Sequence, residues 1–474
     1  MLWLCTHLPA LPLEALLPPA PPMQGAVPVA VVADGASPRR LIGVNAAAAD
    51  RGLVAGMPLQ AALALVPELQ ALRRKPEAET QALEAVACWL YGFGAPVTVD
   101  AAACCVWVEI GGSLRRCGGW SGFARRFAEA DAATELGFTR LPGIAPTLAA
   151  AALAARAGAG LARPILREGD IHSRIRGWPL ALLPVEAPAL ALLHGAGLRR
   201  IGEVLALPEA ALAQRCGPQL PLLLARLLGR AAEAWHAYEP PPQYRRRYEL
   251  AGSVEHAEAL LFPLRKMLGD FALYLRARDV AVQQFRLRFA GSGGRASGLD
   301  IGLLGPSRDA ARLFAVVRER LEQLSLPGPV LELWLEAERF ETAAAAQGGL
   351  FDGGAQQESF DILRERLLAR LGGAAVRRLA VTADQRPEKT FIATWSAAAD
   401  SPKEHPPRPP WLLFQPKPIA MPRLLGPPER IECGWWDGRH ETRDYHLAED
   451  ASGRKLWVYR SLGSAQWHLH GLWQ

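Results

Sequence analysis

Short apolar runs alternate with Ala-rich helical patterns in the first part of the chain. The runs at 2–5, 27–32 and 106–110 have the length and composition of strands, and each ends at or near Gly, Pro or Asp. The segments between them have the longer apolar patterns of helices. This alternation predicts an α/β region.

Residues 178–234 show a purely helical pattern. Glycines punctuate it, which predicts small helices joined by tight turns. The prolines at 240–242 then indicate a linker. The elements after this linker have the order of a small α+β domain: helix 257–275, strand 280–289, helix 308–324 and strand 330–338.

The last part of the chain mixes biased segments with short strand patterns. An Ala/Gly stretch covers 343–355, a helix is predicted over 360–371, and residues 401–422 have the composition of a Pro-rich linker. From 426 to 474, alternating runs such as 455–459 are separated by Ser/Gly turns. They predict a small β module.

Length and composition add a multidomain, globular expectation. A chain of 474 residues is expected to form about three or four domains. The seven cysteines include no CxxC pair, and their odd number fits no closed disulfide framework, so we expect a reducing cytoplasm. The N-terminus lacks the basic region of a signal peptide. The apolar stretch 147–155 is far shorter than the roughly 20 residues of a membrane span.

Positive charge concentrates in residues 244–295, with ten basic side chains against five acidic ones. This segment includes the run Arg245, Arg246 and Arg247. A basic stripe suits a phosphate backbone, and a solvated surface is the alternative.

Several motifs resemble, in order, those of the Y-family translesion DNA polymerases. Residues 5–14 overlay the opening strand D-x-D-A-F-F-A-S-V-E, and residues 102–113 overlay the second acidic strand S-I-D-E-A-Y-L-D-V-T-G-S, both without a gap. The remaining matches are 46–49, 52–58 and 67–69 to the fingers motifs Y-x-A-R, G-V-x-x-G-M and P-D-L, 143–146 to G-I-A-P, and 197–204 to the thumb motif G-I-x-T-I-G-D-L. The resemblance covers roughly the first 340 residues and implies a right-hand fold.

This resemblance implies an α+β multidomain chain with a C-terminal extension. The implied regions are a palm at 1–170 with inserted fingers at about 20–77, a helical thumb at 171–236, a linker at 237–247, a little finger at 248–342, a clamp-binding linker at 343–357, a helix and strand extension at 358–400, a Pro-rich linker at 401–425, and a β module at 426–474.

The residues that carry polymerase chemistry in the family differ here. Its metal-binding acids fall on Cys5, Cys104 and Cys105, and its triphosphate-binding Tyr and Arg fall on Ala46 and Ala49. Mg²⁺ requires oxygen ligands, and thiol sulfur is too soft to replace them. We therefore expect no catalysis, no bound metal and no cofactor.

Two nearby acids offer an alternative. On an extended strand Asp100 would lie roughly 13 Å from Cys104, and Glu109 is displaced by five residues from the acidic pair. An active polymerase that uses these displaced acids remains a second hypothesis.

The cysteines themselves raise the question of a zinc site. Cys5, Cys104, Cys105 and His7 are candidate ligands, but adjacent strand residues face opposite sides, so Cys104 and Cys105 cannot both point inward. We favour small buried core cysteines. The C-terminal histidines are interpreted as structural: His440, His446, His468 and His470.

DNA binding needs only positive side chains and backbone amides, so it can outlast the loss of catalysis. In the thumb, Gly197 and Gly202 fit a hairpin that presents amides to phosphate, with Arg199 and Arg200 between them, while the family's other Gly-Ile-Gly turn is missing near 185–187. In the little finger, Arg286 and Arg288 share one strand face. We expect phosphate contacts at these sites and at 245–247.

Residues 347–351, Gln-Gly-Gly-Leu-Phe, resemble the Q-x-x-L-F peptide that bacterial proteins insert into a sliding clamp. Leu350 and Phe351 would be the apolar anchors, and Gln347 would make the polar contact. Two large apolar residues in an Ala/Gly linker have no core to join, which favours a docking peptide.

The missing acids, this peptide and the C-terminal extension together resemble the inactive branch of the family found in the bacterial mutasome. The resemblance implies DNA, the sliding clamp, a RecA-related accessory protein and an error-prone replicative-type polymerase as partners. A DNA-binding module unrelated to replication is a further alternative. Tryptophans 435, 436, 457, 467 and 473 fit either an interface or a β-module core.

Overall fold

The protein is described by a computed structural model that divides into two compact units, Met1–Arg366 and Leu367–Gln474. Within the described residues, no helix is long and apolar enough to cross a membrane. The predicted α+β multidomain class is confirmed. The structure describes residues 1–17, 27–33, 39–134, 136–291, 296–322, 324, 326, 328–342, 363–364, 367–368, 370–371, 376–377, 379–393 and 407–473.

The region predicted as the palm is built on a four-stranded antiparallel sheet of order β5-β6-β1-β7. Successive residues of β1 face opposite sides of this sheet: Leu2 and Leu4 pack into one core, Trp3 and Cys5 into the other. The strands are β1 Trp3–His7, β5 Val97–Asp100, β6 Cys105–Glu109 and β7 Leu141–Ala145.

Helices cover both faces of the palm sheet. One core gathers side chains from α1, α4 and α6, and the other joins the sheet to α7 and the thumb. Burial of these apolar faces, at roughly 25 cal/mol per Å², is the main force that holds the layers together. The helices are α1 Leu11–Glu14, α4 Pro76–Leu90, α5 Gly111–Arg116, α6 Trp120–Ala133 and α7 Leu148–Arg156.

The predicted fingers form a small three-stranded sheet of order β3-β2-β4 with two short helices. Ala30, Leu41, Ala48 and Leu53 belong to its separate core. The elements are β2 Val29–Val32, β3 Leu41–Val44, α2 Ala46–Ala49, α3 Leu59–Leu65 and β4 Gln70–Arg73.

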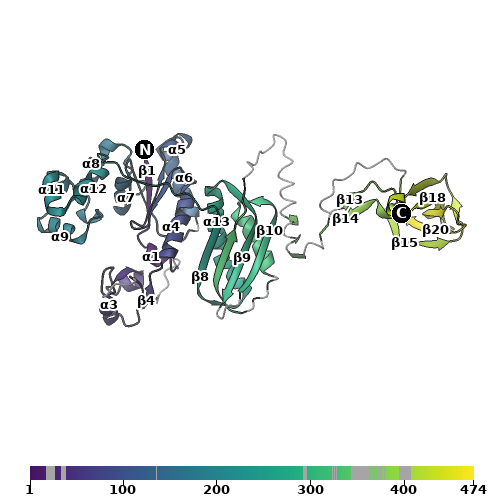
Figure 1. The fold of residues 1–474 in the computed structure, drawn as a ribbon, viewed down its shortest axis with the longest axis horizontal. Helices are drawn as coiled ribbons and strands as arrows, with labels where there is room; N and C mark the ends of the chain where they lie inside the picture. Colours follow the sequence, from purple (N-terminus) through teal and green to yellow (C-terminus); the bar gives the residue numbers. More distant parts are fainter. Residues whose placement is uncertain are drawn as a thin grey trace. The chain divides into compact units, whose positions relative to one another are not determined.

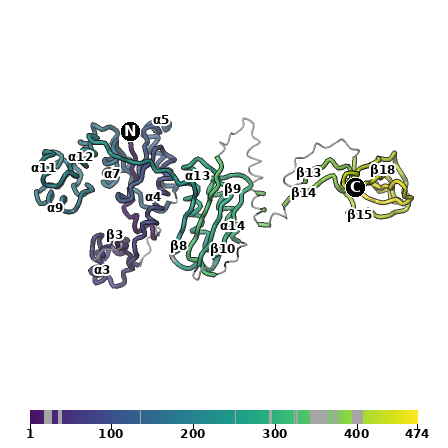
Figure 2. The backbone as a smooth tube through the Cα atoms, viewed as in Figure 1, coloured from purple at the N-terminus to yellow at the C-terminus, as the bar shows by residue number. Residues whose placement is uncertain are grey.

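The predicted thumb is helical, as the glycine-punctuated pattern indicates, and its helices gather into one cluster (Figure 2). Its buried leucines and isoleucines share a core with α7. The elements are η1 Glu168–Asp170, α8 Ile171–Ile175, η2 Leu180–Leu182, α9 Ala187–Gly195, α10 Ile201–Leu205, α11 Glu209–Cys216 and α12 Gln219–Leu227.

The predicted little finger has a sheet of order β10-β9-β11-β8, with β12 added beside β9. Two helices, α13 and α14, pack against the sheet (Figure 1). Strands β8 and β10 are absent from the sequence prediction. The elements are β8 Tyr244–Val254, η3 Ala257–Leu260, α13 Leu261–Ala277, β9 Val280–Gly291, β10 Ala296–Ser307, α14 Ala310–Leu321, β11 Val330–Ala337 and β12 Glu341–Thr342.

The C-terminal unit contains a six-stranded antiparallel sheet and a two-stranded β13–β14 pair. Trp457 and Trp467 are buried in it, whereas Trp435 and Trp436 are 75% and 55% exposed, so the tryptophans divide between core and surface. The elements are β13 Leu379–Val381, η4 Pro387–Lys389, β14 Phe391–Ala393, β15 Trp411–Ile419, β16 Arg423–Leu424, β17 Glu429–Cys433, η5 Trp435–Asp437, β18 Glu441–Glu449, β19 Lys455–Ser461 and β20 Trp467–Leu472.

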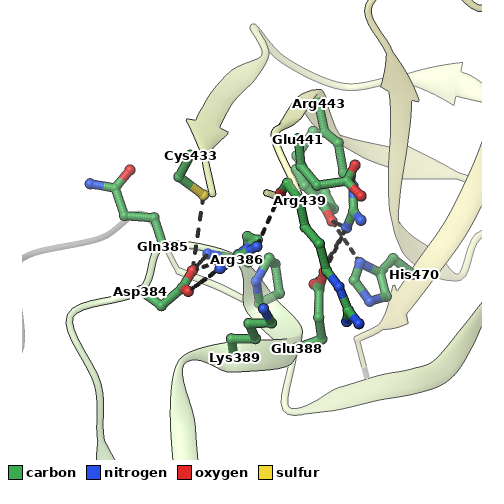
Figure 3. Close-up of polar contacts among 12 residues, drawn as sticks. Asp384, Gln385, Arg386, Glu388, Lys389, Cys433, Arg439, Glu441, Arg443 and His470 are labelled. Atoms are coloured by element: carbon green, nitrogen blue, oxygen red, sulfur yellow. Dashed lines mark hydrogen bonds and ion pairs between the residues drawn. The ribbon is translucent and has the colours of Figure 1, made fainter. Parts of the chain in front are cut away.

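Arg386 joins the β13–β14 segment to this larger sheet (Figure 3). Its side chain is almost fully buried, and its Nη2 lies 2.6 Å from an oxygen of Asp384 and 2.8 Å from an oxygen of Asp437. Its Nη1 donates to the carbonyl of Arg439. A buried guanidinium requires such partners, and these fix the loop that carries Trp435 and Trp436.

Two predicted linkers contain strands. β8 begins at Tyr244, inside the segment 237–247, and β15 begins at Trp411, inside 401–425. Among the described strands β15 lies at the sheet edge and pairs with β20, and its register shifts between Leu412 and Lys417. An edge strand tolerates proline because one of its sides needs no ladder hydrogen bonds. Proline content therefore misled the prediction for the second linker.

Candidate functional site

β1 and β6 are direct neighbours, and they are the strands that the motif resemblance aligns with the acidic strands of the polymerases. In their register Cys5 lies opposite Trp107, and His7 lies opposite Cys105. Residues two apart on a strand face the same side, so Cys5, His7 and Cys105 share one face of the sheet. Two of the three cysteines that the motif resemblance aligns with metal-binding acids, Cys5 and Cys105, therefore lie together.

Cys5 and Cys105 are fully buried, and each thiol shifts the pKa of the other. The Cys105 Sγ also lies 3.4 Å from Nδ1 of His7. Burial raises the pKa of the Cys5 thiol, whereas the hydrogen bond from Cys5 is the main cause that lowers the pKa of Cys105. Cys5 and Cys105 therefore form a compact thiol pair inside an apolar core.

Cys104 lies apart from this pair. It occupies the turn before β6 with φ +52° and packs against the opposite core of the palm. The prediction that Cys104 and Cys105 do not both point inward is confirmed. Within the described residues, no group of three or more His, Cys, Asp or Glu side chains is arranged to hold a metal ion. The zinc interpretation therefore gains no support.

The expectation for Asp100 was wrong. Residues 101–104 form a turn rather than an extended strand, so Asp100 pairs directly with Cys105 across β5 and β6. Its Oδ1 accepts hydrogen bonds from the amides of Ala102 and Ala103 at 2.9 and 3.0 Å. Asp100 is thus close to the thiol pair, and its carboxylate stabilises the turn.

Glu109 has a structural role as well, because its Oε1 accepts hydrogen bonds from the amides of Leu2 and Gly111. A pair of divalent ions requires several carboxylate oxygens at one place. Cys5, Cys105 and the single carboxylate of Asp100 do not provide that set. The residues present do not fit the two Mg²⁺ ions of the polymerases.

In the fingers, Ala46 and Ala49 form the ends of α2. The helix begins at Asn45, whose side chain accepts from the amide of Ala48 and from that of Val29. Methyl side chains at 46 and 49 offer no donor to a phosphate. Asn45 therefore holds the start of α2 in place, and the alanines at 46 and 49 contribute no group that could bind a triphosphate.

Gly143, the glycine in the segment that matches the G-I-A-P motif, is required for close packing. A Cβ at this position would overlap the main chain of Ala151 and Ala155 in α7. The glycine therefore lets α7 pack directly against β7. Its role is packing.

The thumb hairpin uses its amides internally. Gly197 donates to the carbonyl of His194, and Gly202 donates to the carbonyl of Arg176 at 2.9 Å. The amides of Arg199 and Arg200 both donate to the Glu203 carboxylate, at 2.7 and 3.0 Å. These amides could bind phosphate only if their internal hydrogen bonds broke. We therefore keep the arginine side chains as candidate DNA contacts and remove the backbone amides.

Four exposed arginines meet at this hairpin: Arg174, Arg176, Arg199 and Arg200. Pro179 bridges to Arg200, and the close approach of Gly202 to Arg176 brings the two chain segments together. In the part of the chain that the structure describes, none of the four forms an ion pair. Sequence reasoning missed Arg174 and Arg176, although their spacing before Trp178 was a visible signal.

The arginine run of β8 divides between two faces. Arg246 has a side chain only 16% exposed and forms an ion pair with Glu84 of α4, so we remove it from the candidate DNA contacts. Arg245 and Arg247 lie on the open face of the sheet, which alternation along a strand requires. They face acids of β11, namely Glu336 and Glu332.

Arg286 and Arg288 lie on that same open face, as predicted from their spacing. Arg286 forms a two-bond pair with Asp300 at 2.6 and 3.2 Å. Arg288 lies 3.6 Å from the carboxylate of Glu336. The little-finger arginines are present and exposed, but each has an acidic neighbour.

The predicted clamp peptide, with Gln347, Leu350 and Phe351, lies outside the described residues. Of the four C-terminal histidines, His470 is buried and its Nδ1 lies 2.7 Å from the hydroxyl of Tyr445. This contact agrees with the structural role expected for His470.

Comparison with known proteins places the chain beside polymerase-like relatives. Residues 21–156 match the impB/mucB/samB family. Protein ImuB from two strains of Caulobacter vibrioides is 29% identical over 468 residues, which cover 89% of this chain and 99% of ImuB. These matches confirm the resemblance predicted from the motifs.

Solved structures with similarity include an insertion ternary complex of Dbh DNA polymerase and DinB from Sulfolobus solfataricus, each 14% identical with a TM-score of 0.40. Both matches cover 71% of this chain and 98% of the other chain. The chain is thus similar to the impB/mucB/samB family over residues 21–156 and to ImuB over 89% of its length.

Proposed function

We propose that this chain is a non-catalytic, Y-family polymerase-like adaptor. It binds DNA and the sliding clamp and recruits an error-prone polymerase for translesion synthesis during damage-induced (SOS) mutagenesis. Its further partner is an ImuA-like, RecA-related protein. We infer a cytoplasmic location for this work, where its DNA and clamp partners reside.

The thiol pair at Cys5 and Cys105 carries this proposal. The strands β1 and β6 are adjacent, and Cys5 and Cys105, which the motif resemblance aligns with metal-binding acids, are fully buried there. A buried thiol pair cannot align two Mg²⁺ ions with a primer and a triphosphate. The fold persists where the chemistry is missing, which favours a scaffolding role.

The exposed arginines of the thumb support DNA binding. Among the described residues Arg174 and Arg176 form no ion pair, so their charge is available to phosphates. Arg199 and Arg200 are exposed as well, but the Glu203 carboxylate lies on their amides and partly offsets their charge. Such contacts hold a duplex without reading its sequence. An adaptor that acts at any damaged site needs this kind of binding.

The clamp proposal rests on the peptide at 347–351 and on the similarity to ImuB. We would measure binding of the purified chain to the sliding clamp, for the wild type and for a Gln347→Ala, Leu350→Ala, Phe351→Ala variant. The matched control carries Gln356→Ala and Gln357→Ala in the neighbouring sequence. Loss of the anchors should weaken binding by at least about tenfold, and the control should bind like the wild type.

Two results would remove the clamp from this function. Either the wild type fails to bind the clamp, or the anchor variant binds equally well. Damage-induced mutagenesis that persists in cells carrying the anchor variant, with the protein normally folded, would favour a DNA-binding module unrelated to replication.

One observation favours the alternative of an active polymerase. Asp100 pairs directly with Cys105 and so lies closer to the ligand positions than its sequence distance predicts. A primer-extension assay with Mg²⁺ and with Mn²⁺ tests this alternative. Incorporation that disappears in an Asp100→Asn variant would establish it, and absence of incorporation supports the adaptor.

A further inference from the structure

The open face of the little-finger sheet carries one row of alternating charges with further ion pairs beside it. In the register of the strands, Glu336 lies opposite Arg245 on one side and Arg286 on the other, and Arg286 in turn lies opposite Asp300. This row therefore reads arginine, glutamate, arginine, aspartate across β8, β11, β9 and β10. Opposite charges in direct cross-strand positions attract each other.

The contacts follow this register in part, because Glu336 contacts its partner Arg245 but reaches diagonally to Arg288 on β9. Glu336 Oε1 lies 3.7 Å from Nε of Arg245 and 3.6 Å from Nη1 of Arg288, so one carboxylate forms ion pairs with two arginines. Asp300 holds Arg286 by two bonds.

The neighbouring rows do not alternate. Trp334 lies between Arg247 and Arg288, and Glu332 lies opposite Glu249, so the ion pair of Arg247 with Glu332 is diagonal. Glu332 accepts from Arg247 Nε at 3.1 Å, and Glu249 lies 3.3 Å from the same guanidinium. Trp334 lies beside it, with the Arg247 guanidinium 5.6 Å from its ring centre.

The charges on this face largely offset one another, although Lys75 adds a further cation beside Glu249. Four guanidinium groups, on Arg245, Arg247, Arg286 and Arg288, meet four carboxylates, on Glu249, Asp300, Glu332 and Glu336. The thumb hairpin has four exposed arginines without ion pairs in the described chain. Positive charge is therefore present in both places, and it is less neutralised at the thumb, where the Glu203 carboxylate lies beside Arg199 and Arg200.

We propose that the carboxylates of Asp300, Glu332 and Glu336 lower the DNA affinity of the little finger, because they form ion pairs with the arginines that would otherwise bind phosphates. This inference rests on the proposed function, in that it requires the chain to bind DNA.

A phosphate that approaches Arg286 must displace the Asp300 carboxylate and tolerate its repulsion. Each exposed pair is individually weak, at about 0–1 kcal/mol, so displacement is possible but lowers the gain from each phosphate contact. The thumb then supplies most of the affinity, and the little finger lies on the duplex backbone with little net attraction. Such a surface allows the adaptor to leave the DNA readily.

Replacing the carboxylates in the full-length chain tests this proposal. We would titrate a fluorescent primer–template duplex with the wild type and with Glu336→Gln, Asp300→Asn and the double variant, over a range of salt concentrations. Glu322→Gln is the matched control, because Glu322 is exposed at the end of α14 and its replacement removes the same charge away from this face.

Glu336→Gln frees two arginines and should raise the affinity about five- to tenfold at about 0.1 M salt, while Asp300→Asn should raise it about threefold. The slope of log affinity against log salt should become steeper by about one for each freed phosphate contact. Glu322→Gln should change the affinity by less than about twofold, since it alters only the net charge.

A second pair of variants separates local from general effects. Arg286→Ala in the wild type should change the affinity little, because Asp300 already occupies that side chain. Arg286→Ala in the Asp300→Asn variant should abolish the gain of that variant.

If the wild type binds DNA but Glu336→Gln and Glu322→Gln have equal effects, the carboxylates do not tune binding and this inference fails while the proposed function stands. If neither the wild type nor any carboxylate variant binds DNA, DNA binding itself is lost from the proposed function. A wild type that fails to bind beside a Glu336→Gln variant that binds would support the inference in its strongest form.

Discussion

The guanidinium of Arg246 forms an ion pair with Glu84, whereas Arg245, one residue earlier on β8, lies 3.7 Å from Glu336 on the opposite face of the sheet. The two adjacent arginines therefore form ion pairs on opposite faces of the sheet. Arg246 connects the little finger to α4 of the palm, and its guanidinium also lies 5.5 Å from the ring centre of Tyr244. The desolvated position of Arg246 makes its partner indispensable.

We expect Arg246→Met to lower the free energy of unfolding of the chain by about 1–3 kcal/mol, because it leaves the partly buried Glu84 carboxylate without its partner. Arg245→Met, at a side chain that is 61% exposed, should cost less than about 0.5 kcal/mol. Urea unfolding followed by tryptophan fluorescence measures both. Equal effects of the two substitutions would contradict the assignment of Arg246 to packing.

Gly143→Ala should destabilise the palm by about 1–3 kcal/mol, because the added methyl group overlaps the main chain of α7. Gly112→Ala is the matched control, since a Cβ at Gly112 meets no atom within 4 Å. Urea midpoints of the two variants give the comparison. A Gly143→Ala variant as stable as the wild type would show that α7 can move away from β7 without cost.

Local sequence patterns predicted the elements whose side chains alternate or repeat within one segment. The strand expected over 280–289 is β9, the helix expected over 257–275 is η3 followed by α13, and the strand expected over 330–338 is β11. Burial on one face gives each of these segments a period that can be recognised without its neighbours. The motif resemblance likewise predicted strands at Cys5 and Cys105, and these residues lie on β1 and β6.

Long-range pairing could not be predicted in the same way. The run at 245–247 reads as a basic patch because the acids that neutralise it, at 332 and 336, are distant in sequence and meet it only through the strand register. Asp100 was misjudged for a related reason: a turn at 101–104 reverses the chain and brings it opposite Cys105. Register and turn geometry decide both cases, and neither follows from residue spacing alone.

Cys5→Asp should not restore catalysis and should unfold or strongly destabilise the palm. A carboxylate at this fully buried position has no partner, which costs on the order of 3–5 kcal/mol. Cys5→Ala should cost only about 1 kcal/mol, since it removes one small apolar atom from the core. Primer extension and urea unfolding of both variants test this. A stable, active Cys5→Asp variant would show that the site still accommodates metal ions.

Alkaline pH should weaken the palm through Cys88 of α4. Burial raises the pKa of this thiol to about 12, whereas an unfolded cysteine titrates near about 8.5. Below pH of about 8.5 the thiol is protonated in both states; above it only the unfolded chain loses the proton, so stability falls as pH rises towards the folded value, by about 1.4 kcal/mol per pH unit. Cys88→Ala should flatten this dependence between pH 8 and pH 10 in urea unfolding.

Val86→Ala is the control for this measurement, because Val86 is buried in the same helix and does not titrate. It should lower stability by a similar amount at every pH. If Cys88→Ala and the wild type lose stability in parallel as pH rises, Cys88 is not the titrating group.

The thumb arginines give the final prediction. Arg176→Ala combined with Arg200→Ala should lower duplex affinity by about tenfold or more and reduce the slope of log affinity against log salt by about two, because two phosphate contacts are lost. Arg245→Ala combined with Arg286→Ala removes the same charge from the little finger, where Glu336 and Asp300 already oppose it. This pair should change the affinity less than about twofold. The reverse ranking would place the main DNA contact on the sheet and would mean that phosphates displace its carboxylates easily.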